Sequence, residues 1–204
     1  MTARYAAACG AREVHGLDVA RLAEASARGV RAIQFDLNGR ERLPYADRSF
    51  DLVTCLETLE HLVEPDRIVA EAFRILRPGG TLVVDVPRLD SWMTIVLLLL
   101  GRQPSGVECS LRRRYGAMNR DSVLTGHVSY FTRRAFREML EVAGFRLDGE
   151  SGAGMGRGYR ADRHRRGLRV GAVEGLASWI NDRLPLRKDF LIVRATRPAG
   201  DPPA

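Results

Sequence analysis

Short apolar segments alternate with helical patterns along the first half of the chain. The segments have the length and apolar content of buried strands and cover residues 13–17, 31–35, 50–55 and 81–86. A helical pattern over 19–28 ends at Gly29, and a second helix opens at Glu64-Pro65 and is expected to end at Pro78-Gly79-Gly80. Strands that alternate with helices predict an α/β fold with a mostly parallel sheet.

The second half is less regular. A nine-residue apolar run, Trp92 to Leu100, predicts a buried helix that covers a sheet. The remaining elements expected are a helix from Thr132, as N-cap, to Gly144, a strand at 145–147, a glycine-rich turn at 152–158, a helix near 168–184 and a strand at 189–195. We expect a single domain over residues 1–196, with a lid or insertion at 101–131 and a frayed tail at 197–204.

Composition excludes several classes of protein. The chain has 204 residues, is 45% apolar and carries a formal charge of +7, but Lys188 is the only lysine among 32 basic residues. Arginine has replaced lysine almost everywhere, which indicates a coding bias rather than specific nucleic-acid binding. The three cysteines have no CxxC spacing, so neither a disulfide framework nor a metal site is predicted, and a cytoplasmic location fits. A membrane span needs about 20 apolar residues, so no membrane association is expected.

Acidic residues follow three of the predicted strands. Asp18 follows the first, Asp36 the second and Glu57 the third. Ligands bind outside the carboxyl ends of parallel strands, and a carboxylate there can accept hydrogen bonds from ribose hydroxyls. A single acid at a strand end is more often a helix cap or a solvated loop residue, and that alternative stays open for each. Three in succession favour a nucleoside pocket.

Four further pieces occur in a fixed order between residues 10 and 87. They are Asp36-Leu37, Leu43-Pro44-Tyr45-Ala46-Asp47-Arg48-Ser49-Phe50-Asp51, Leu59-Glu60-His61-Leu62 and Arg74-Ile75-Leu76-Arg77-Pro78-Gly79-Gly80. Together they resemble the class I S-adenosylmethionine-dependent methyltransferases that act on small molecules. The resemblance implies a Rossmann-like, doubly wound fold and S-adenosyl-L-methionine as cofactor. It also implies cofactor contacts from Asp18 and its neighbour Val19 to the ribose, from Asp36 and Leu37 to the adenine, and from Leu56 and Glu57 on the methionine side.

Residues 88–147 resemble a narrower branch, the MetW-like proteins. The similarity rests on Trp92 to Pro104, Gly126-His127-Val128-Ser129-Tyr130-Phe131-Thr132 and Ala143-Gly144-Phe145. It leaves two classes of function open. One is a methyltransferase with a small-molecule substrate, and the other is a non-catalytic partner or pseudoenzyme with degenerate cofactor binding. A protein partner or a homodimer also stays open.

Two histidines are candidate catalytic bases. Methyl transfer needs a base only where the acceptor must lose a proton, and His61 or His127 could serve near neutral pH. The alternative for each is an ordinary structural role, as a cap, a packing residue or a partner of a backbone carbonyl.

The usual first strand and glycine-rich loop of this fold are absent before Asp18. The loop is expected about 20 residues upstream of that acid, which places it before Met1. The sequence therefore predicts a truncated N-terminus. Three explanations are open: a start codon placed too late, a true short form whose flanking strands pair directly, or a strand supplied by a partner chain.

Overall fold

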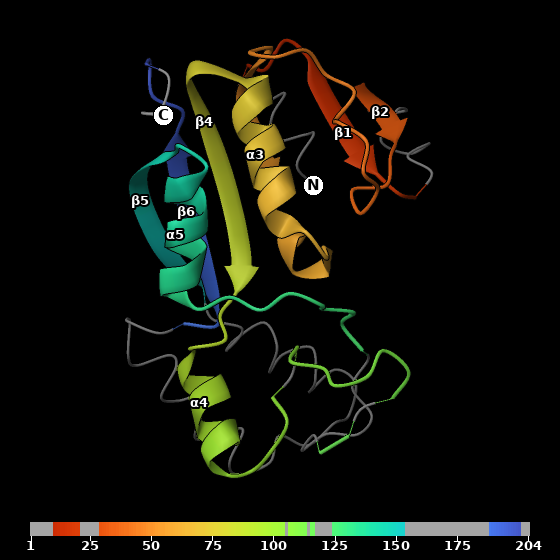
Figure 1. Ribbon diagram of the computed structural model, residues 1–204, viewed down its shortest axis with the longest axis vertical. Coiled ribbons are helices and arrows are strands. Elements are labelled where there is room, and N and C mark those ends of the chain that lie inside the picture. Colours follow the sequence, from red (N-terminus) through yellow and green to blue (C-terminus); the bar gives the residue numbers. More distant parts are fainter. Residues whose placement is uncertain are drawn as a thin grey trace. The chain divides into compact units, whose positions relative to one another are not determined.

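The computed structural model describes residues 10–20, 29–104, 106–113, 115–116, 124–153 and 188–200 (Figure 1). The chain divides into two compact units, Met1–Arg42 and Leu43–Ala204. Within the described ranges no helix has the length and apolar character needed to cross a membrane. The predicted single domain over 1–196 stays a prediction.

The first unit contains a parallel pair of strands, β1 (Val14–Asp18) and β2 (Val30–Gln34). Gly29 precedes β2 at a φ of 80°, a conformation that glycine adopts without steric cost. Among the described residues of this unit, Val30 is the one apolar residue that is buried. The two predicted strands are confirmed with a shift of one residue each, whereas residues 21–28 of the predicted helix lie outside the described residues.

The second unit contains a four-stranded sheet in the order β3-β4-β6-β5. The strands are β3 (Phe50–Cys55), β4 (Leu76–Pro87), β6 (Phe190–Thr196) and β5 (Arg146–Ala153). β3 runs parallel to β4, while β6 is antiparallel to both β4 and β5, so the sheet is mixed. The predicted α/β class is confirmed.

β5 is longer than the predicted strand at 145–147. It continues through Gly152 to Ala153, so the expected turn at 152–158 is wrong for its first two residues. Antiparallel pairing with β6 reaches from Thr196 to Phe190 and keeps this segment extended. Residues 154–158 and the helix expected near 168–184 lie outside the described residues.

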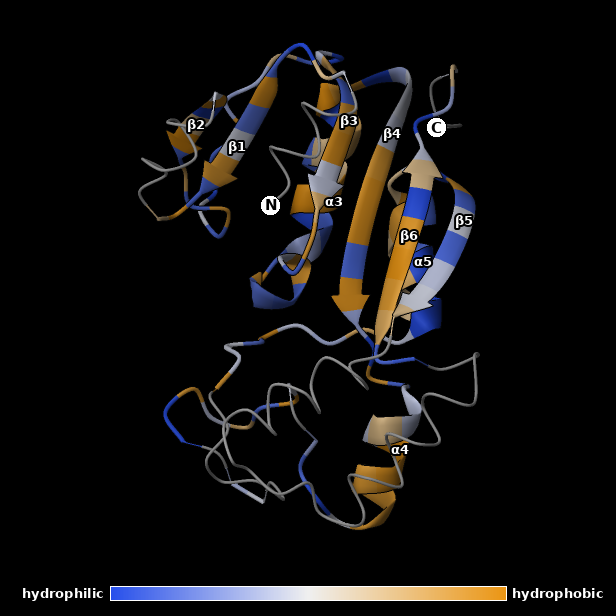
Figure 2. Cartoon of the chain, turned by 180° about the vertical axis from the view of Figure 1, so that it is seen from behind, coloured by the Kyte–Doolittle hydropathy of each residue, from blue (hydrophilic) through white to orange (hydrophobic). Residues whose placement is uncertain are grey.

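Two helices cover one face of this sheet. They are α3 (Pro65–Ile75) and α5 (Arg133–Val142), and Figure 2 shows both of them behind the strands. β4 alternates along its length, so Leu82, Val84 and Val86 are buried on one face. Phe136 and Leu140 of α5 are fully buried. Thr132 caps α5 as predicted, because its hydroxyl accepts a hydrogen bond from the Ala135 N–H.

α3 passes directly into β4. The helix ends at Ile75, and Pro78-Gly79-Gly80 lies inside the strand, so the prediction that these residues end the helix is wrong by about one turn. Arg197 explains the difference: its N–H donates to the Gly80 carbonyl, its own carbonyl accepts from Gly79 N–H, and these bonds hold the segment extended. Gly80 has no room for a side chain, because an added Cβ would lie 2.8 Å from the Arg77 carbonyl oxygen.

Arg197 also corrects the predicted frayed tail. It is buried, and its guanidinium donates to the carbonyls of Phe73, Arg74 and Leu76 at the end of α3. These carbonyls have no intrahelical partner, so a cation there is favourable. The chain is therefore fixed at residue 197, and residues 201–204 lie outside the described residues.

The apolar run forms α4 (Trp92–Leu99), capped by the Ser91 hydroxyl, which accepts from Thr94 N–H. Leu98, Leu99 and Leu100 are 52%, 82% and 53% exposed, so the prediction of a buried, sheet-covering helix is wrong for its last turn. A helix that is apolar on all sides needs partners all round, and here burial reaches only Thr94 and Leu97.

Candidate active site

A backbone constraint follows β3. Glu57 has a φ of 50°, which is uncommon for a residue other than glycine, and its N–H donates to Asp85 Oδ1 of β4 at 2.7 Å. The two residues are 28 positions apart, and the parallel pairing of β3 with β4 brings their strand ends together. The loop after β3 is thus held in an unusual conformation by a long-range hydrogen bond.

The next turn buries an acid. The short 3-10 helix η1 (Leu59–His61) places Leu59 in the core, and Glu60 is only 1% exposed. Both carboxylate oxygens of Glu60 are buried without a hydrogen-bond partner. Burial raises the pKa of Glu60. An unpartnered buried carboxyl is costly, so this position calls for a reason beyond packing.

Residues 124–131 lie along η1. The N–H groups of Val128 and Ser129 both donate to the Glu60 carbonyl, at 2.8 and 3.1 Å, and the Ser129 hydroxyl donates to the Leu62 carbonyl at 2.6 Å. The Leu89 N–H donates to the Phe131 carbonyl beyond the end of β4. The segment predicted as part of a lid is therefore attached to η1, and the attachment brings His127 to His61.

The two histidines form an edge-to-face pair with ring centroids 5.0 Å apart. His127 Nε2 lies 4.0 Å from Glu60 Oε1, and the His127 side chain is 11% exposed. His127 Nδ1 lies 3.0 Å from the Gly106 carbonyl, and His61 Nδ1 lies 3.2 Å from the Gly126 carbonyl. A carbonyl can only accept, so in both rings Nδ1 is the donor.

Glu108 and Tyr130 hold this arrangement. The Glu108 carboxylate accepts from the N–H groups of Thr125 and Gly126, at 2.7 and 2.9 Å. The Tyr130 hydroxyl accepts from Glu108 N–H and lies 3.0 Å from the carbonyl oxygens of Glu108 and His127. Tyr130 therefore supports the His127 backbone.

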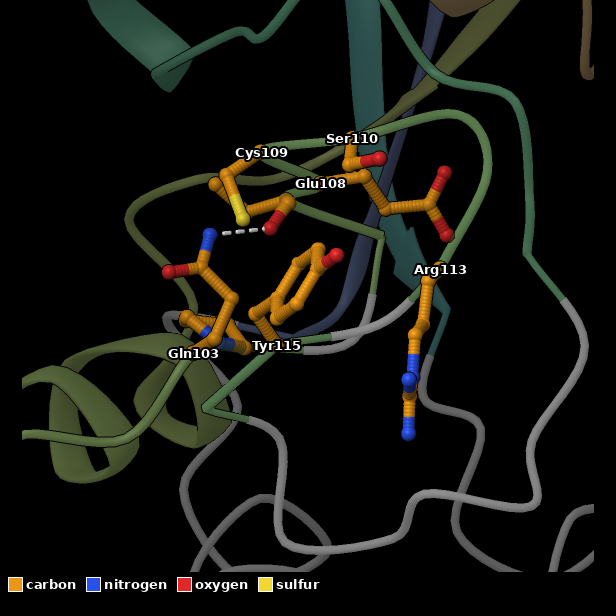
Figure 3. Close-up of a pocket in the computed structure, with 8 residues that line it drawn as sticks. Gln103, Glu108, Cys109, Ser110, Arg113 and Tyr115 are labelled. Atoms are coloured by element: carbon orange, nitrogen blue, oxygen red, sulfur yellow. Dashed lines mark hydrogen bonds between the residues drawn. The ribbon is translucent and has the colours of Figure 1, made fainter.

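A small hollow is lined by residues between Gln103 and Tyr115. Figure 3 shows Gln103, Cys109 and Tyr115 facing one another, while Glu108 and Arg113 extend along its other side. The Gln103 side chain donates to the Val107 carbonyl and closes this turn.

The acids beside His61 share one electrostatic property. Burial raises the pKa of Glu57, with a further contribution from Asp85, and burial also raises the pKa of Asp85. Carboxyl groups that are desolvated and close to one another gain most from a nearby positive charge. The arrangement suits a cationic ligand.

The sequence-predicted residues fall into two groups. Asp18, Val19, Asp36 and Leu37 belong to the first unit, and Leu56, Glu57, His61 and His127 belong to the second. The structure brings His61 and His127 together. Asp18 Oδ1 accepts from Ala20 N–H and Asp36 Oδ1 from Asn38 N–H, each at 2.9 Å, so both acids make the local turn contacts that were the structural alternative.

Two acids of the site were missed by sequence reasoning. In the sequence, Glu60 belongs to the motif Leu59-Glu60-His61-Leu62, and Asp85 belongs to a predicted strand. In the structure, Glu60 provides the buried carboxyl and Asp85 accepts the hydrogen bond from Glu57. A signal was present for Asp85, the acid of β4, which is flanked by Val84 and Val86. An acid in an apolar run calls for a functional or electrostatic reason. Glu60 follows Leu59 but precedes His61, so the sequence gives no such signal for it.

A family profile described as a methyltransferase domain matches residues 1–149. The chain belongs to this family of class I S-adenosylmethionine-dependent methyltransferases. Membership implies S-adenosyl-L-methionine as the cofactor.

Individual relatives are similar over shorter stretches. The chain is 33% identical over 81 residues to 27-O-demethylrifamycin SV methyltransferase of Amycolatopsis mediterranei, which covers 40% of this chain and 26% of that protein. It is 32% identical over 123 residues to the ubiquinone/menaquinone biosynthesis C-methyltransferase UbiE of Methylobacterium nodulans. This match covers 55% of this chain and 45% of that protein. The chain thus spans less than half the length of each of these curated relatives.

The fold has a solved counterpart in an S-adenosylmethionine-dependent methyltransferase from Mesorhizobium loti. The TM-score is 0.61 at 21% identity, with 96% of this chain and 85% of that chain covered. This similarity confirms the Rossmann-like fold.

The described residues fit the cofactor. The Ala20 N–H donates to Oδ1 of Asp18, and a carboxylate has a second oxygen that can accept from a hydroxyl such as those of ribose. In the second unit the desolvated carboxyl groups of Glu57, Glu60 and Asp85 are groups that a nearby positive charge, such as a sulfonium, would favour in their ionised form.

Proposed function

We propose that this chain transfers the methyl group of S-adenosyl-L-methionine to a small molecule. The observation that carries the proposal is the cluster of Glu57, Glu60, His61 and His127 beyond the carboxyl end of β3, in a chain of the methyltransferase family. The fold alone would not suffice, because one fold hosts many chemistries.

In this proposal the strand-end residues hold the cofactor. Asp18 and Val19 contact the ribose, Asp36 and Leu37 the adenine, and Leu56 and Glu57 the methionine portion. When bound, the cofactor supplies a methyl group activated by a sulfonium. The acids around Glu57 favour that positive charge, and the Glu57–Asp85 hydrogen bond fixes the loop that presents them.

The histidines act on the methyl acceptor. Their Nδ1 atoms face backbone carbonyls, so Nε2 is the atom that accepts a proton from an acidic acceptor group. His127 is largely shielded from solvent, which suits a reaction in which water must be excluded. The named relatives modify an O-linked position in one case and carbon in the other, and our proposal is limited to a small acceptor that loses a proton.

The test is methyl transfer by the full chain. Methyl-labelled S-adenosyl-L-methionine is incubated with a set of phenolic and polyketide acceptors, and extractable label is counted. We expect transfer, and a loss of about 10²–10⁴-fold in the variant His127→Gln, the range for a general base. His15→Gln, a change to a histidine of β1, is the matched control. Equal rates in wild type and His127→Gln would contradict the proposed role of this residue.

A further inference from the structure

Glu60, His61 and His127 have the donor set of a metal site. Each offers one ligand atom, and the three atoms lie within 4.8 Å of one another. They come from two segments, η1 and residues 124–131, that backbone hydrogen bonds join.

The buried carboxyl is an independent sign of a ligand. Glu60 is 1% exposed, and both of its oxygens lack a hydrogen-bond partner. His127 Nε2 lies 4.0 Å from Oε1, which is too long for a hydrogen bond. A metal ion between these atoms would satisfy the carboxylate.

Both imidazoles are oriented as metal ligands are. A ligating histidine donates its other ring N–H to a carboxylate or carbonyl, which fixes the tautomer. Here Gly106 and Gly126 supply those carbonyls to Nδ1, so Nε2 is the ring atom that would bind an ion. Gly106 is fitted to this role, since its φ is 80° and an added Cβ would lie 3.1 Å from His127 Nδ1.

We propose that Glu60, His61 and His127 bind one divalent transition-metal ion, Zn²⁺ or an ion of similar preference. With metal–ligand bonds of about 2.0–2.2 Å, ligand atoms of a tetrahedral site lie about 3.3–3.6 Å apart. The spacing of 4.0 Å between His127 Nε2 and Glu60 Oε1 is therefore within reach of small side-chain rotations. Two imidazoles and one carboxylate suit Zn²⁺, Co²⁺, Fe²⁺ or Mn²⁺ better than Ca²⁺, which prefers oxygen alone.

Three protein ligands leave coordination positions open, as in catalytic rather than structural zinc sites. An oxygen atom of the methyl acceptor would occupy one of them, and the ion would favour loss of its proton. The ion uses the Nε2 lone pairs, so in the metal-bound form it takes the place of the Nε2 base, and this single step rests on the proposed methyl transfer. Metal binding itself does not depend on that activity.

The experiment is a titration of the metal-free full chain with Co²⁺, followed by its visible absorption, and then with Zn²⁺ as competitor. We expect saturation at one Co²⁺ per chain, with the intense bands of a low-coordinate ion that Zn²⁺ abolishes. Absence of saturable binding by the folded chain would overturn the proposal, whatever the methyl-transfer assay shows.

Three variants locate the ion. Glu60→Gln keeps the shape of the side chain and His127→Gln removes an imidazole, and each is expected to weaken Co²⁺ binding at least as much as the 10–100-fold that loss of a supporting contact costs. His15→Gln is expected to bind as wild type. Circular dichroism confirms that each variant is folded. Equal affinity in folded Glu60→Gln, His127→Gln and His15→Gln would show that the ion binds elsewhere and would overturn the assignment.

Discussion

The acids of the two units are held in opposite ways. In the first unit, Asp18 and Asp36 are bonded by backbone N–H groups two residues further on, and Asp18 is exposed. In the second unit, Glu60 is buried, and Asp85 accepts a hydrogen bond from a residue 28 positions away. Local bonds leave a carboxylate accessible to a ligand, whereas burial makes it depend on distant partners.

The contrast indicates different roles for the exposed acids of the first unit and the buried acids of the second. Exposed acids at strand ends lower the stability of the fold very little, and they can accept hydrogen bonds from ribose hydroxyls. Their removal is therefore expected to weaken ligand binding more than it destabilises the fold. Buried acids raise the free energy of the folded chain unless a cation offsets them. The two units thus make different contributions to one proposed reaction.

The largest expected difference concerns the cores. Phe136→Ala, at a fully buried position of α5, is expected to lower the free energy of unfolding by about 3–5 kcal/mol. Ile33→Ala, on β2, where the side chain is 37% exposed, is expected to cost under about 1 kcal/mol. Urea denaturation measures both. Equal losses of unfolding free energy would show that side-chain burial stabilises the first unit as much as the second.

The same difference between the units is expected for charged contacts: removal of a long-range contact in the second unit should cost more stability than removal of a local contact in the first. Arg74 donates to the Glu71 carboxylate at 2.7 and 2.8 Å and to the carbonyls of Tyr45 and Leu43 at 2.8 and 3.1 Å, and it thereby ties α3 to the loop before β3. Arg74→Ala is expected to cost about 1.5–3 kcal/mol.

The matched changes sharpen this expectation. Arg74→Lys keeps the charge but not the planar fork, and should lie between wild type and Arg74→Ala. Asp36→Ala removes only a contact within its own turn and is expected to cost under about 1 kcal/mol. A loss from Asp36→Ala as large as that from Arg74→Ala in the same denaturation experiment would remove the distinction between local and long-range contacts.

The smallest expected effect is chemical. Burial raises the pKa of Cys55, in β3, to about 12, so at pH 8 only about one molecule in 10⁴ carries the thiolate. Cys109 is exposed. Mass spectrometry of peptides after brief iodoacetamide treatment at pH 8 should find Cys109 modified and Cys55 intact. Modification of Cys55 in the native protein would show that the sheet opens at β3.

The elements that periodicity and caps define were predictable from sequence. The strands at β1 to β4 and the Thr132 cap depend on local pattern, and the structure confirms them. The extension of β4 through Pro78-Gly79-Gly80 was not predictable, because Arg197 creates it from more than 100 residues away. The roles of Glu60 and Asp85 likewise depend on tertiary contacts. His61 and His127 were named separately, and only the docking of residues 124–131 on η1 pairs them.

The central claim is that the exposed strand-end acids bind the cofactor, and calorimetric titration of the full chain with S-adenosyl-L-homocysteine tests it most directly. We expect saturable binding that Asp18→Ala weakens by about 10–150-fold, the equivalent of a charge-assisted hydrogen bond of about 1.5–3 kcal/mol. Asp51→Ala, which alters an exposed acid paired with Arg77 at the start of β3, should bind as wild type. Absence of binding to the folded chain, or unchanged affinity in Asp18→Ala, would contradict the account.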